Sequence, residues 1–163
     1  MPGLERLNYV KKCIVAGCII SKDGKVLLIK HKKLGVWLYP GGHVEPNEHP
    51  HEAAVREAFE ETGLHVRLVS CSKLSIKTKE AISLPLPFAA MLENVPYKTG
   101  AHLHFDLVYA AKPESGKVSF SKSEATGIRW FSKKELSSIE TFENVKQILL
   151  AFFDVCIEKK KKV

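Results

Sequence analysis

Residues 42–64 of this chain read Gly-His-Val-Glu-Pro-Asn-Glu-His-Pro-His-Glu-Ala-Ala-Val-Arg-Glu-Ala-Phe-Glu-Glu-Thr-Gly-Leu. The second half predicts a helix from Pro50 to Thr62, because proline suits the first helical turn. Gly63 follows at the position where helices commonly end in the left-handed conformation. The Gly41-Gly42 pair before the helix allows unusual backbone angles and close approach of another group. We therefore expect a glycine-containing loop followed by a helix.

Three acidic side chains of this helix, Glu57, Glu60 and Glu61, share one face because residues three and four apart are neighbours. Their mutual repulsion and their place near the negative end of the helix are both unfavourable. The chain has no general excess of acid, since its formal net charge is +7. A bound cation would remove both penalties, and carboxylate oxygens suit Mg²⁺ or Mn²⁺. The alternative is a solvated acidic surface.

Arg56 lies four residues after Glu52 and four before Glu60, so its guanidinium can orient a ligating carboxylate. The alternative is a pair of exposed salt bridges, which contribute little. Glu48, just before the helix, can accept from free amides or reach the metal site. We expect the apolar Val55 and Phe59 to pack on a sheet.

The segments around this unit predict a mixed sheet with helices on both faces. Asp23-Gly24 between two apolar runs predicts a hairpin. Pro85 and Pro87 indicate an irregular edge segment at 82–92. The predicted strands cover 10–20, 26–29, 66–70 and 102–111; a capping box at 132–135 opens a short helix, and a last helix runs from 141 to about 158.

The spacing within residues 42–64 spells a known signature. Gly42 is followed by five residues, Glu48, seven residues, Arg56-Glu57, an apolar residue, any residue, Glu60-Glu61, any residue, Gly63 and an apolar residue. This resembles the Nudix box, with every defined position filled. The flanking Trp37-x-x-Pro40-Gly41-Gly42 and Arg129-Trp130-Phe131 also resemble segments of that family, and the resemblance covers roughly residues 10–136.

The resemblance implies an α/β fold, the Nudix-type α/β/α sandwich with a mixed β-sheet, and hydrolysis of a nucleoside diphosphate linked to another moiety. It makes Glu57, Glu60 and Glu61 metal ligands, adds the carbonyl of Gly42, and gives Arg56 the role of holding the glutamates. A carboxylate must also take the proton of the attacking water. Glu60, Glu61 and Glu124 remain alternatives for that role.

Three polar residues, His102, His104 and Asp106, alternate along a predicted strand and so point to one face. They can form a polar wall of the substrate pocket, an additional metal site, or a polar sheet face satisfied by its neighbours. His43, beside the glycine pair, is expected to face the phosphates. Trp37 can stack on a base or pack in the core.

The 163 residues suit one domain, with a Lys-rich tail at about 159–163. The chain has neither a signal-peptide pattern nor an apolar run of about 20 residues, so we expect a cytoplasmic protein without a membrane partner. The spacing of the four cysteines fits neither a zinc knuckle nor a CxxC pair, which indicates reduced thiols rather than a redox centre.

The expected activity is therefore hydrolysis of a diphosphate linkage in a small nucleotide, such as a nucleoside triphosphate or a nucleotide sugar. Mg²⁺ is the expected cofactor, with Mn²⁺ as a substitute. One alternative is removal of a 5′-terminal diphosphate or cap from RNA, which the net charge of +7 permits. Another is a module that binds nucleotide without cutting it. Proteins that resemble this family are often dimers, so a homodimer is an open alternative that the sequence itself does not decide.

Overall fold

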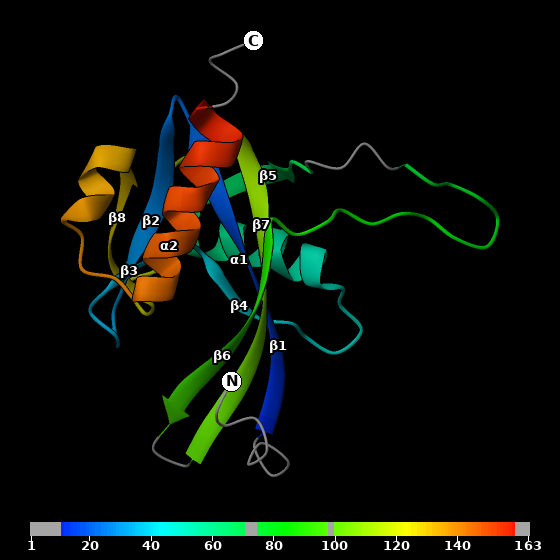
Figure 1. Cartoon of the computed structure of the whole chain (residues 1–163), viewed down its shortest axis with the longest axis horizontal. Coiled ribbons are helices and arrows are strands. Elements are labelled where there is room, and N and C mark those ends of the chain that lie inside the picture. The colour runs from blue at the N-terminus through cyan, green and yellow to red at the C-terminus, as the bar shows by residue number, and fades with distance from the viewer. Residues whose placement is uncertain (1–10, 71–74, 98–99, 159–163) are drawn as a thin grey trace.

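The computed structural model of the chain describes residues 11–70, 75–97 and 100–158, so the Lys-rich tail lies outside the described residues. Figure 1 shows the arrangement of the elements. The strands are β1 (Lys11–Lys22), β2 (Lys25–His31), β3 (Trp37–Leu38), β4 (Gly41–His43), β5 (Leu64–Leu68), β6 (Ala89–Tyr97), β7 (Gly100–Gly116) and β8 (Ala125–Phe131). The helices are α1 (Pro50–Thr62), the 3-10 helix η2 (Lys133–Ser137), α2 (Glu143–Phe152) and the π-helix η3 (Phe153–Glu158).

The sheet is mixed, and β1 connects its parts. β1 runs parallel to β7 over ten paired residues, from Lys11↔His102 to Ile20↔Ala111, and turns back into β2 as a hairpin. The short strand β4 pairs with β1 at residues 15–17. β7 carries β6 along one part of its length and β5 along the other, while β2 pairs with β3 and β8. The hairpin prediction is confirmed.

Two hydrophobic clusters cover the two faces of the sheet, one under each long helix. Helix α2 contributes apolar side chains that pack with Ile19, Val108 and Phe131. Helix α1 packs on the other face through Ala53, Ala54 and Ala58, all completely buried. The helices therefore lie on opposite faces (Figure 1), which confirms the α/β sandwich with a mixed sheet.

The side of α1 that faces the sheet differs from our prediction. Phe59 is 46% exposed and stacks on His65, while Val55 is only partly buried. The buried positions are small residues, because a helix lying close to a sheet leaves room for methyl groups rather than for an aromatic ring. This close approach also brings Glu61, on the next turn, into the interior, where it is 8% exposed.

The ends of the predicted helices agree closely with the sequence signals. Helix α1 begins at Pro50 and ends before Gly63, which has φ 69° and donates its N–H to the carbonyl of Phe59 at 2.8 Å. The capping box before η2 is formed, with the backbone N–H of Ser132 donating to Glu135 Oε2 at 2.8 Å. Turn and cap chemistry is local, so the sequence predicts it well.

Three other predictions were incomplete. The strand expected at 66–70 begins two residues earlier as β5, and the last helix begins at Glu143 and continues as a π-helix. The irregular segment with Pro85 and Pro87 is followed by a regular nine-residue strand, β6, which pairs along β7. Strand β8 was not predicted. Within the described part of the chain, the helices are too short or too polar to span a membrane.

Candidate active site

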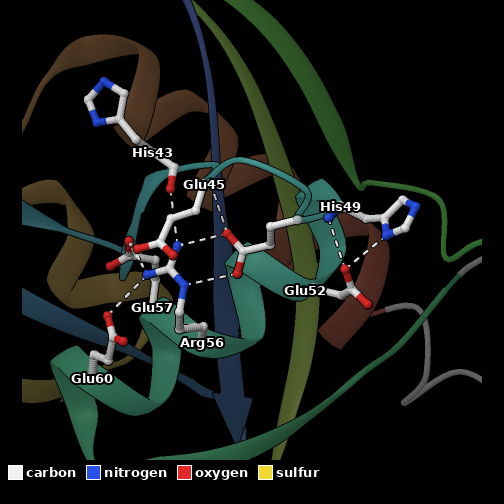
Figure 2. Close-up of polar contacts among 8 residues, drawn as sticks. His43, Glu45, His49, Glu52, Arg56, Glu57 and Glu60 are labelled. Carbon is white, nitrogen blue, oxygen red and sulfur yellow. Dashed lines mark hydrogen bonds and ion pairs between the residues drawn. The ribbon is translucent and has the colours of Figure 1, made fainter.

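The guanidinium of Arg56 holds the carboxylates of the α1 region together (Figure 2). Nε and one terminal nitrogen donate to the two oxygens of Glu48, at 2.9 and 3.0 Å. The other terminal nitrogen donates to Glu57 Oε1 at 2.8 Å and to Glu60 Oε2 at 3.1 Å. A fifth bond, 3.1 Å long, reaches the carbonyl of His43. These five bonds use every donor that arginine has.

The exposure and the partners of Arg56 bear on its two interpretations. Its side chain is 24% exposed and that of Glu48 is 15% exposed, so the bidentate pair is more than a loose surface contact. Glu52, the other partner that we considered, instead accepts from the backbone N–H of His49 (Figure 2). Arg56 therefore ties the loop before α1 to the acids of the helix.

The glycine pair in β4 lies against two of these acids. The backbone N–H of Gly41 donates to Glu61 Oε2 at 2.8 Å. A Cβ atom added to Gly42 would lie 2.3 Å from Glu57 Oε1, so only glycine lets that carboxylate approach the strand so closely. The box thus brings two carboxylates to the same short stretch of backbone.

The electrostatics of the cluster match a site for a cation. Burial, together with the charges of the nearby Glu57, Glu124 and Glu60, raises the pKa of Glu61 to about 8, against the lowering effect of the Gly41 N–H. Burial also raises the pKa of Glu57, although Arg56 opposes this shift. Crowded carboxylates of this kind are stable as anions only with added positive charge nearby. Their hard oxygen donors fit a divalent cation such as Mg²⁺.

Glu124 comes close to this cluster from another part of the chain. It lies just before β8, its side chain is exposed, and its charge raises the pKa of both Glu57 and Glu61. Its backbone carbonyl accepts from the N–H of Lys32 at 2.7 Å, which fixes this segment beside β2. Glu60 is the most exposed acid bonded to Arg56, at 52%. The structure therefore brings all four predicted acids into one neighbourhood.

A cavity of about 440 Å³ lies on the face of the sheet that α2 covers. Several polar residues line it, among them Tyr39, His43, Glu93, His104, Asp106 and Asn144, which come from four strands or their adjoining loops and from α2. Gly41 and Gly42 line it as well. Since the same two glycines contact the acids of α1, strand β4 separates the acidic cluster from the cavity by the thickness of one backbone.

Asp106 and Glu93 give this cavity an acidic wall with raised pKa values. Asp106 is 5% exposed, and burial raises its pKa while the hydroxyl of Tyr39, donating at 2.8 Å, lowers it. Burial also raises the pKa of Glu93, which accepts from the amide of Asn144 at 2.5 Å. Buried carboxyl groups with amide and phenol neighbours can exchange hydrogen bonds with a heterocyclic base.

The predicted pocket residues separate into two groups. His43, His104 and Asp106 line the cavity. His102 is on the same strand face but lies two residues before His104 in β7, where it pairs with Lys11, and its ring centroid lies 6.4 Å from that of His104. The rings of Trp37 and Phe131 meet edge to face, with centroids 4.8 Å apart, so the geometry favours core packing over stacking on a base.

Sequence reasoning missed several polar residues of the cavity, among them Tyr39, Glu93 and Asn144. Tyr39 follows the residues of β3, and a two-residue strand leaves no periodic signal. Glu93 lies in β6, which the prolines before it concealed. Residues 89–92 are a short apolar run without alternation, so the sequence carries only a weak signal for this strand.

Comparison with known proteins agrees with this geometry. The NUDIX domain profile matches residues 11–153, which is most of the chain. The chain belongs to the NUDIX domain family. It is similar to a hydrolase of the NUDIX family from Clostridium perfringens, whose crystal structure superimposes with a TM-score of 0.75 at 31% identity, covering 90% of this chain and 99% of that one.

Two curated relatives show how far the likeness extends. A MutT-like protein of Streptomyces ambofaciens is 30% identical over 123 residues, covering 76% of this chain and 65% of that protein. The ADP-ribose pyrophosphatase of Methanocaldococcus jannaschii is 48% identical over a shorter stretch, covering 34% of this chain and 35% of that enzyme. The chain thus spans just under two thirds of the first relative and about one third of the second.

Proposed function

We propose that this chain is a Mg²⁺-dependent pyrophosphohydrolase that cleaves the diphosphate linkage of a small nucleotide. The observation that carries the proposal is the position of the acids held by Arg56 directly across β4 from a polar cavity. One side offers oxygen ligands for a cation and the other offers room for a base and sugar. A substrate containing both a phosphate chain and a heterocycle matches these two halves.

Glu57, Glu60 and Glu61, with the carbonyl of Gly42, are the groups we expect to hold the cation. The cation supplies charge neutralisation for the phosphate oxygens and a lower pKa for the attacking water. Arg56 keeps Glu57 and Glu60 in place through its bonds at 2.8 and 3.1 Å. Mn²⁺ takes similar oxygen ligands, so we expect it to substitute.

A carboxylate must take a proton as the water oxygen bonds to phosphorus and the leaving phosphate departs with the electron pair of the broken P–O bond. Glu60, Glu61 and Glu124 are the candidates for this base. Glu124 is exposed, and it reaches the cluster from the β8 side rather than from α1. The acidic limb of the pH–rate profile should shift only in the variant that lacks the base.

The cavity favours a nucleoside triphosphate or a related nucleotide over a sugar phosphate without a base. Its acidic wall, with Asp106 and Glu93 beside Tyr39 and Asn144, can donate to and accept from the edge of a base. Relatives with the names ADP-ribose pyrophosphatase and CTP pyrophosphohydrolase also act on molecules that contain a nucleobase.

The test is a substrate panel with Mg²⁺ and with EDTA, scored by the phosphorus-containing products. The panel should contain nucleoside triphosphates, nucleotide sugars, dinucleotides and RNA with a 5′-triphosphate. Cleavage of a nucleoside triphosphate to the monophosphate and diphosphate, lost with EDTA, is expected. Cleavage of RNA alone would favour the RNA alternative, and tight nucleotide binding without products would favour the non-catalytic module.

Variants of α1 test the assignment of the acids. Glu57→Gln and Glu61→Gln should each lower kcat by at least about 100-fold, because each removes a charge that stabilises the transition state. Glu52→Gln is the matched control, since it changes the same helix at an acid bonded to His49 rather than to Arg56. Near wild-type kcat in either of the first two variants would show that these ligands are wrongly assigned.

A further inference from the structure

A second cluster of metal-binding side chains lies on the cavity face of the sheet, away from the glutamates of α1. It contains Cys13, His43 and His104, whose ligand atoms all lie within 4.8 Å of one another. Each comes from a different strand, respectively β1, β4 and β7. The cluster is therefore assembled by the fold, and the spacing of these residues in the sequence does not reveal it.

The register of the sheet explains why these three side chains meet. Cys13 pairs directly with His104 across β1 and β7, so their side chains stand next to each other on the same face. His43 pairs with Val15, which is two residues along β1 from Cys13 and so points to the same face. The N–H of Val44 donates to the carbonyl of Ile14 at 3.0 Å and keeps the end of β4 against β1.

The burial of the three residues suits a site that is open on one side. His104 is 8% exposed, Cys13 is partly buried and His43 is exposed. The rings of His43 and His104 meet edge to face, with centroids 5.2 Å apart. Since His43 is the exposed member and has room to turn, a small movement can bring all three donors around one ion.

We propose that Cys13, His43 and His104 bind Zn²⁺ through one thiolate and two imidazoles, leaving the fourth position open. Thiolate and imidazole are the donors that Zn²⁺ prefers, whereas Mg²⁺ takes oxygen ligands. On binding, the thiol of Cys13 loses its proton to solvent as the sulfur–zinc bond forms. Three protein ligands with an open position is the arrangement found in zinc sites that bind a further ligand.

Zinc at this site would compete with the nucleotide for the wall of the cavity. His43 and His104 line the cavity, while Cys13 lies behind them on β1. An ion bound by all three would hold His43 against the sheet and place a cation at the wall of the cavity that we propose for the nucleotide. We therefore expect Zn²⁺ to inhibit hydrolysis at concentrations where Mg²⁺ supports it.

The test uses Co²⁺ as a spectroscopic substitute for Zn²⁺, on the full chain kept reduced and stripped of metal. One equivalent of Co²⁺ should produce a sulfur-to-metal charge-transfer band in the near ultraviolet. One equivalent of Zn²⁺ should abolish this band, and excess Mg²⁺ should leave it unchanged. Absence of the band, or a band that excess Mg²⁺ removes, would overturn the proposal.

Variants assign the ligands. Cys13→Ser should abolish the band and weaken Zn²⁺ binding by more than about 100-fold, since loss of a ligand exceeds the 10- to 100-fold effect of losing a ligand's hydrogen-bond partner. His43→Asn should weaken binding as well, and it tests the site independently at an exposed position. Cys156→Ser is the matched control, because this partly buried cysteine lies in η3 and packs against the hydrophobic cluster under α2, outside the proposed site. A band that survives in Cys13→Ser, or disappears in Cys156→Ser, would contradict the assignment.

The two proposed metal sites can fail separately. Glu57→Gln should keep the Co²⁺ band, because Glu57 belongs to the cluster around Arg56. Relief of Zn²⁺ inhibition in Cys13→Ser depends on the proposed hydrolase activity, whereas the band does not. If no substrate is cleaved but the band forms and follows Cys13, the zinc site stands and the proposed hydrolase function fails.

Discussion

The acidic cluster around Arg56 and the wall of the cavity lie on opposite sides of β4, and they are built in different ways. The cluster comes almost entirely from one continuous stretch, from Gly41 to Glu61, and Arg56 bonds to it at five points. The wall is collected from β1, β4, β6, β7, α2 and the residue after β3, and its members include the bonded pairs Tyr39–Asp106 and Asn144–Glu93. We infer that the first region carries out the chemistry and the second selects the substrate.

The change expected to have the largest effect is Gly42→Ala. Its Cβ would lie 2.3 Å from Glu57 Oε1, so the carboxylate must move, while the fold itself should be little affected. We expect kcat to fall by about 100- to 1,000-fold, the scale for losing one stabilising group. Gly127→Ala is the control, because its nearest neighbour would be 3.6 Å away, at Trp37. Equal kcat values in the two variants would show that the position of Glu57 is irrelevant.

The next effect is that of Arg56→Lys. A lysine keeps the charge but cannot make two parallel bonds to Glu48 while also reaching Glu57 and Glu60. We expect the affinity for Mg²⁺ to fall by about 10- to 100-fold, as for other groups that orient ligands. Isothermal titration of Mg²⁺ measures this. Arg67→Lys, at an exposed pair with Glu114, is the control and should leave the affinity unchanged.

The acidic cluster could be predicted from the sequence better than the cavity wall, because the cluster comes from one continuous stretch and the wall comes from several strands. Because the acids, Arg56 and Gly42 are fixed by helical and loop geometry within one stretch, their spacing identified them. The cavity wall depends on strand register, which brings Asp106 opposite Met91 of β6 and places Tyr39 within reach of it. No local pattern encodes such long-range pairing, so Tyr39, Glu93 and Cys13 could not be assigned from the sequence.

In the fold as well, local features were predicted and the packing between elements was not. Helix α1 and the β1–β2 hairpin were predicted because their caps and turns are local. The inner side of α1 was not, since amphipathic reasoning placed Phe59 on the sheet where alanines lie. The distance between a helix and a sheet is set by the packing of both elements, and the sequence of the helix alone does not reveal it.

A smaller effect, on binding rather than on catalysis, is expected for Tyr39→Phe. The change removes the hydroxyl that donates to Asp106 at 2.8 Å. Loss of a bond to a buried acceptor costs about 1–3 kcal/mol, so the free energy of unfolding should fall by that amount. We expect KM to rise while kcat changes little. Steady-state kinetics measures KM and kcat, and urea unfolding measures the free energy of unfolding. A loss of kcat without a rise in KM would show that Tyr39 contributes to the chemical step instead.

The smallest expected effect is on the pH dependence of stability. Burial raises the pKa of Asp106 above 3.8, so the folded protein holds this proton more tightly than the unfolded chain. Stability from this group is therefore greatest at low pH and is lost as the pH rises above that value. Between about pH 4 and about pH 7, wild type should lose more stability than Asp106→Asn, measured without metal. If the free energy of unfolding depends on pH in the same way in both proteins, the raised pKa of Asp106 is contradicted.

The three alanines beneath α1 have a consequence for how this protein can evolve or be engineered. Ala53, Ala54 and Ala58 are completely buried, and Glu57 and Glu61 belong to the same rigid helix. A larger side chain at any of these three alanines would tilt α1 or move it away from the sheet. Both carboxylates would then be displaced from β4 together. Substitutions that place larger side chains between α1 and the sheet should therefore lower the activity, although the substituted residues contact neither the metal nor the nucleotide.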